Sequence, residues 1–225
     1  ALITAIPIPL VLLIKEGERT RGESFDWSAF AAFNNKTIIA LGLLGFLFFF
    51  IIQGANQLVN AFLQTEFQIS LSMAGYFTTV WGLGVVLGGV FGGRLSARIG
   101  MKNATRLAIL AGLIGILLLA LISGPALAWP LVLLFGLAYG TQQTVYFALA
   151  MKYTDTRIAA SMYAILMAIT NVGQGAGMAV SGLLSDQVGF RWTFGILTAL
   201  NLVALPLLAP LFRHETETSE AQASV

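Results

Sequence analysis

The side chains best suited to bind a ligand are five carboxamides in the stretch IIQGANQLVNAFLQ, residues 51–64. Their spacing of i, i+3, i+4, i+7 and i+11 places them on one face of an α-helix. A carboxamide donates and accepts hydrogen bonds without carrying a charge, so this face is suited to a solute rich in hydroxyl or amide groups. The five residues are Gln53, Asn56, Gln57, Asn60 and Gln64.

Two further groups of polar residues interrupt apolar stretches. An amide surrounded by lipid needs a hydrogen-bond partner, so each group is expected to face a water-filled cavity or a neighbouring helix. We favour a cavity for the five carboxamides and for the first of these two groups, and helix packing for the second; both alternatives stay open for all of them. The first group is Gln142, Gln143 and Tyr146, and the second is Thr170, Asn171 and Gln174.

Catalytic and metal chemistry are not expected. The chain has no cysteine and a single histidine, His214, which follows the last apolar stretch. No histidine or carboxylate lies near the centre of an apolar stretch. A membrane-embedded enzyme would need a constellation of such groups. We therefore expect no enzymatic activity, no metal site and no cofactor.

The elements that must position the carboxamides follow from composition. Of the 225 residues, 57% are hydrophobic and 10% are charged, whereas a soluble domain carries about 25% charged residues. A helix that spans a bilayer needs about 20 apolar residues. Two aromatic residues of the apolar stretch at 72–92, Tyr76 and Trp81, are expected to line a cavity or to face lipid. Six stretches are long enough, at roughly 37–63, 72–92, 104–123, 129–151, 158–181 and 191–212.

The basic residues predict the orientation of these spans. If the six spans alternate in direction, eleven of the twelve lysines and arginines fall on one side of the membrane and only Arg191 on the other. Cytoplasmic loops carry such an excess, so we assign 15–36, 93–104, 152–157 and 213–225 to the cytoplasm, in the inner membrane of a bacterium. The basic residues thus have a membrane explanation, and no nucleic-acid partner is expected. The spacing of Trp27, Phe30 and Phe33 predicts a helix at the membrane interface.

The chain also contains an internal repeat with an offset of 89 residues. The second and fifth spans correspond, and because they are three spans apart they must cross the membrane in opposite directions. Inverted repeats of this kind are typical of secondary transporters. Small residues spaced four apart in both spans predict close helix packing. The matched pairs include Gly84 with Gly173, Gly88 with Gly177, Gly93 with Gly182, and Gly100 with Gly189.

The stretch GRLSARIGMK, residues 93–102, resembles the loop signature of the major facilitator superfamily, G-x-L-a-D-R-x-G-R-K. Ala97 stands where the family has aspartate, which leaves the family's charge latch between its two halves in doubt. The stretch from Tyr153 to Phe190 also resembles the muropeptide-permease and acetyl-CoA-transporter group. The residues that match the signature, with a role in gating and topology, are Gly93, Arg98, Gly100 and Lys102, and in the second copy Asp186 and Gly189.

This resemblance implies the C-terminal half of a twelve-helix transporter, an all-α membrane bundle. Its partners would be a small-molecule solute, membrane lipid and an N-terminal half of the same chain, which would hold the titrating carboxylate if transport is coupled to protons. A non-transporting assembly or pigment-delivery factor on the same scaffold is the alternative. The expected parts are the end of helix six at 1–14, a central loop at 15–36, six spans at 37–212 and a tail at 213–225.

Overall fold

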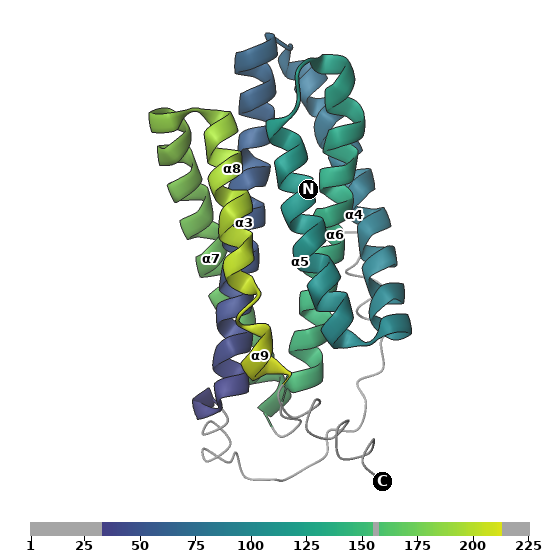
Figure 1. Cartoon of the computed structure of the whole chain (residues 1–225), viewed down its shortest axis with the longest axis vertical. Helices are drawn as coiled ribbons and strands as arrows, with labels where there is room; N and C mark the ends of the chain where they lie inside the picture. Colours follow the sequence, from purple (N-terminus) through teal and green to yellow (C-terminus); the bar gives the residue numbers. More distant parts are fainter. Residues whose placement is uncertain (1–32, 155–157, 213–225) are drawn as a thin grey trace, which may run out of the picture.

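The computed structural model describes residues 33–154 and 158–212, and these form helices that run alternately up and down (Figure 1). The predicted all-α bundle of six crossings is confirmed. The last crossing is interrupted, because a 3₁₀ turn and Pro206 follow the end of its first helix. The elements are α3 (Lys36–Phe67), α4 (Leu71–Ile99), α5 (Met101–Ala120), α6 (Pro125–Tyr153), α7 (Ala159–Val188), α8 (Phe190–Asn201), η3 (Leu202–Ala204) and α9 (Leu208–Leu211).

Five of these crossings are long and apolar enough to span a membrane by length and composition alone, and α6 is the exception within the described residues. Helix α6 carries the polar run Thr141–Gln142–Gln143 and an internal proline, Pro130. It packs against both α4 and α5, so a large part of its surface faces other helices and not the bilayer. A helix in such a position can carry polar residues that a lipid-facing helix could not.

The predicted loop at 93–104 is wrong in extent. Helix α4 continues to Ile99 and α5 begins at Met101, so Gly100 alone makes the turn. Its φ of 77° lies in a region that side chains disfavour, and glycine adopts it without steric cost. The segment 152–157 is also shorter than predicted, since α6 includes Lys152 and Tyr153. Of the predicted interfacial helix only Phe33 is described, and the end segments 1–14 and 213–225 lie outside the described residues.

The internal repeat is visible in backbone conformation. Gly189, the counterpart of Gly100, turns α7 into α8 with a φ of 83° and a similar ψ. Helices α4 and α7 occupy corresponding places in the two repeats and run in opposite directions (Figure 1). The repeat is therefore inverted, as the odd number of intervening spans predicts.

The small residues of the two repeats make corresponding packing contacts. Gly84, Gly88 and Gly92 of α4 are buried against α6, where a Cβ on Gly88 would overlap the carbonyl of Leu137. The counterparts on α7 are buried against α3, where a Cβ on Gly177 would overlap the carbonyl of Phe50. The first repeat comprises α3, α4 and α5, and the second comprises α6, α7 and α8. Each contact therefore joins the second helix of one repeat to the first helix of the other.

Arg191 of α8 contacts both α5 and α3 at the end of the bundle away from Arg94. Its Nη1 donates to the carbonyl of Ala120 at 2.6 Å and its Nη2 donates to that of Ile122 at 2.7 Å. The last carbonyls of a helix have no partner within the helix, so the bond to Ala120 caps α5, and the bond to Ile122 holds the segment that follows it. The guanidinium also lies 5.4 Å from the centre of the Phe62 ring, at the end of α3.

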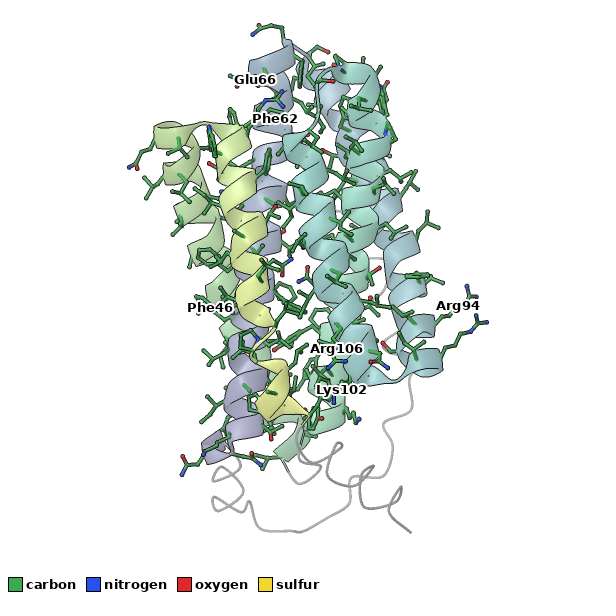
Figure 2. The ribbon with its side chains drawn as sticks, viewed as in Figure 1. Phe46, Phe62, Glu66, Arg94, Lys102 and Arg106 are labelled. Carbon is green, nitrogen blue, oxygen red and sulfur yellow. The ribbon has the colours of Figure 1, made fainter. Side chains whose placement is uncertain are left out.

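We expect Arg191→Lys to lower the free energy of unfolding by about 1–2 kcal/mol, because a lysine cannot make the forked pair of charge-assisted bonds. Denaturant unfolding of the purified protein in mild detergent measures the change. Arg94→Lys is the matched control, since Arg94 points away from the bundle (Figure 2) and is exposed. Equal losses in the two variants would contradict the capping role.

Candidate solute-binding site

The carboxamide face of α3 connects this helix to α6 through Gln53. Its Oε1 accepts a hydrogen bond from the Tyr139 hydroxyl at 3.0 Å and a longer one from Asn56 Nδ2 at 3.4 Å. The Tyr139 ring packs edge-to-face on Trp81 of α4, with ring centres 5.2 Å apart and planes at 79°. Gln53 thus holds an aromatic pair that fixes the position of Trp81.

The next two carboxamides of the same face reach the other neighbours of α3. Gln57 Nε2 donates to the Ser181 hydroxyl of α7 at 2.8 Å and also to the carbonyl of Met178. Asn60 Nδ2 donates to the Thr78 hydroxyl of α4 at 2.9 Å. Gln53, Gln57 and Asn60 therefore form hydrogen bonds between helices, which is one of the two alternatives that the spacing left open.

The same face also lines a cavity, so the two alternatives do not exclude each other. The cavity has a volume of about 180 Å³ and lies between α3, α4 and α6, in the half of the bundle away from the Gly100 turn. None of its lining residues is charged, and five of them carry a side-chain donor or acceptor. The lining residues are Asn56, Gln57, Val59, Asn60, Phe77, Thr78, Trp81 and Val132.

Sequence reasoning missed two polar residues of this site, Tyr139 and Thr78. Both lie on helices that the carboxamide spacing of α3 does not describe, and only the packing reveals Thr78. A signal did exist for Tyr139, which precedes the polar Gln142 by three residues and therefore lies near it on α6. Of the two aromatic residues considered for a cavity wall, Trp81 lines the cavity and Tyr76 is exposed.

The polar cluster of α6 lies outside this cavity. Tyr146 is fully buried among apolar side chains, with its ring centre 5.8 Å from that of Phe49. Gln142 is also buried and approaches Asn201 of α8 beside Gly112 of α5. Gln143, on the neighbouring face, is half-buried. The structure thus separates these residues from the carboxamides of α3.

The polar residues of α7 do not line the cavity either. Thr170 is buried, and its hydroxyl donates to the carbonyl of Met167 within its own helix at 2.7 Å. Asn171 is exposed and Gln174 is half-buried. The buried face of α7 is formed largely by small residues packed on α3, as the spacing of its glycines predicts.

The loop-signature residues cluster at the two glycine turns. Arg98 is exposed in the last turn of α4, where a positive charge interacts favourably with the helix dipole. Lys102 lies in the first turn of α5 (Figure 2). Gly93 and Asp186 are exposed, on α4 and α7 respectively.

The described residues contain no group of three histidines, cysteines or carboxylates placed to hold a metal ion. The chemistry that the cavity offers is neutral hydrogen bonding beside an aromatic ring. Such a site can hold and orient a polar solute, and it contains no nucleophile paired with a base.

Comparisons with known proteins point in one direction. The family model of the Major Facilitator Superfamily matches residues 1–166 and again residues 41–225. A search of curated proteins found no match. Among solved structures, the chain is similar to a mutant of the peptide transporter POT in complex with alafosfalin, with a TM-score of 0.69 and 18% identity over 80% of this chain and 39% of that chain.

Two other structures are similar to a comparable degree. One is the POT mutant in complex with sulfate, with a TM-score of 0.69 and 19% identity over 80% of this chain and 38% of that one. The other is an inward-facing, unoccupied bacterial homologue of the human lysosomal transporter Spinster, with a TM-score of 0.60 and 14% identity over 89% of this chain and 52% of that one.

The chain therefore spans about two-fifths to one-half of the length of these transporters. At these identities the likeness shows the fold and no narrower group. Taken together, the two matches of the family model cover all 225 residues of the sequence. Together with the alternating apolar helices, it establishes that this chain is a non-enzymatic, multi-pass membrane protein and that it belongs to the Major Facilitator Superfamily.

Proposed function

We propose that this chain forms the C-terminal half of a secondary active transporter, which moves a small organic solute by alternating access against an N-terminal half of the same protein. Membership of the superfamily supports transport. The inverted repeat supports a mechanism in which helix bundles rock around a central site. The end that carries Arg94, Arg98 and Lys102 is assigned to the cytoplasm on the basis of the charge asymmetry.

The observation that carries the solute site is the uncharged cavity between α3, α4 and α6. Asn56, Gln57 and Asn60 line one wall, and Trp81 lies on α4 opposite them. Among the described residues Asn56 makes only the long bond to Gln53, so its carboxamide is the one most free to bond a solute. We propose that the solute is neutral where it meets this half, with hydroxyl or amide groups that exchange hydrogen bonds with these side chains.

The experiment is uptake into proteoliposomes that contain the full-length transporter. A panel of sugars, polyols and amides is first screened by solute-induced thermal stabilisation, and uptake of the strongest hit is then measured. We expect Asn56→Leu to raise KM about five- to tenfold, which corresponds to the loss of one hydrogen bond of about 1–1.4 kcal/mol.

Asn171→Leu is the matched control, because Asn171 lies on α7 outside the cavity and is exposed. We expect its KM and maximal rate to equal those of the unchanged protein. Gln53→Ala and Gln143→Ala complete the set, one beside the cavity and one away from it. The cavity assignment is abandoned if Asn56→Leu and Gln53→Ala both leave KM and maximal rate unchanged.

A further inference from the structure

A second polar site lies apart from the proposed solute cavity, where α5, α6 and α8 meet. Gln142 of α6 is 1% exposed and Asn201 of α8 is 0% exposed. Both side chains approach Gly112 of α5: a Cβ added there would lie 2.5 Å from Gln142 Oε1 and 2.9 Å from Asn201 Nδ2. Because Gly112 has no side chain, two carboxamides from different helices can converge beside α5.

Three atoms of this pair are buried and have no hydrogen-bond partner within the described part of the chain. They are both amide atoms of Gln142 and the Oδ1 of Asn201. The orientation of Asn201 is set by its other atom, since Nδ2 donates to the carbonyl of Ile109 at 3.2 Å. Its Oδ1 must therefore be an acceptor. The open groups are two acceptors and one donor.

Such groups are costly inside a membrane protein, where neither lipid nor apolar side chains can bond them. The two carboxamides converge without bonding each other, so a third group is needed to satisfy them. A water molecule donates two hydrogen bonds and accepts others, which complements two acceptors and a donor. A cation fits less well, because both side chains are neutral and offer no charge to offset the desolvation of an ion.

We propose that Gln142 and Asn201 hold a bound water molecule that bridges α6 and α8 beside Gly112. The site is independent of the solute cavity and goes beyond the proposed transport activity. It lies where the last crossing is interrupted, since α8 ends at Asn201 and η3 follows directly. The water therefore satisfies polar groups at the one crossing whose helix is broken within the described residues.

The test is water-edited solid-state NMR of the full-length protein in lipid bilayers, with ¹⁵N-labelled glutamine and asparagine. Magnetisation is transferred from water, and the build-up of the Gln142 side-chain signal is followed. We expect build-up as fast as that of the Gln187 side chain, which is exposed at the end of α7. A build-up absent over the same mixing time, or a direct Gln142–Asn201 amide pair seen as a short nitrogen–carbonyl distance, would overturn the proposal.

Two variants test the position of the water, and a change of salt distinguishes water from a cation. Gly112→Ala places a methyl group against both carboxamides, so we expect the fast build-up of Gln142 to be lost while that of Gln187 is kept. Gly195→Ala is the control, because a Cβ there meets nothing within 4 Å. Fast build-up that survives Gly112→Ala would count against the site. Side-chain carbonyl shifts of Gln142 and Asn201 that move when sodium replaces N-methylglucamine would show a cation in place of water.

Discussion

Gly177→Ala is expected to lower the free energy of unfolding by about 1–3 kcal/mol, because the added methyl group would overlap the backbone of α3. The atoms in the way are the carbonyl and Cα of Phe50, and backbone cannot turn aside as the end of a side chain can. The two helices would have to separate along their contact. Thermal or denaturant unfolding in mild detergent measures the loss.

Gly175→Ala on the same helix is the matched control. A Cβ at Gly175 meets nothing within 4 Å, so the substitution adds only the higher helix propensity of alanine, a gain of up to about 1 kcal/mol. The two substitutions are thus expected to change the free energy of unfolding in opposite directions: Gly177→Ala lowers it and Gly175→Ala raises it. The inverted repeat adds that Gly88→Ala, the counterpart on α4, behaves like Gly177→Ala, since its methyl would overlap the Leu137 carbonyl. A Gly177→Ala protein as stable as Gly175→Ala would refute the close contact.

The second large effect is expected at the turn between α4 and α5. Gly100 has φ 77° and ψ 158°, a combination that is almost confined to glycine. A Cβ there would meet nothing within 4 Å, so the cost of Gly100→Ala arises from the backbone alone. We expect a loss of about 1–3 kcal/mol in the free energy of unfolding.

Gly195→Ala separates this backbone effect from the general effect of replacing glycine. Gly195 also has open space around its Cβ position, but it lies within α8 without a positive φ, so we expect no loss there. The repeat predicts that Gly189→Ala matches Gly100→Ala, because the two turns share their conformation. Unfolding curves of the three variants check this, and a Gly100→Ala protein that matches Gly195→Ala would contradict it.

Properties of this chain that depend on local composition and periodicity could be predicted from the sequence. The six crossings, their alternation and the inverted repeat follow from apolar stretch length and from an offset that pairs Gly100 with Gly189. The boundaries were less predictable. Arg94 and Arg98 predict a loop, but charged residues are also tolerated on a helix that emerges from the membrane. Helix α4 therefore continues through them and ends at Ile99.

The partners of each polar side chain were decided by tertiary structure. Gln53 and Gln142 are the same residue type in similar apolar surroundings, yet one supports a cavity and the other meets Asn201 on a helix about sixty residues later. Periodicity tells which residues share a helix face, and this predicted the carboxamide face of α3. It does not tell which helix that face meets, because that depends on how all the crossings pack together. In this protein the close approach at Gly88 and Gly177 selects the partners, and the cavity forms where α3, α4 and α6 meet.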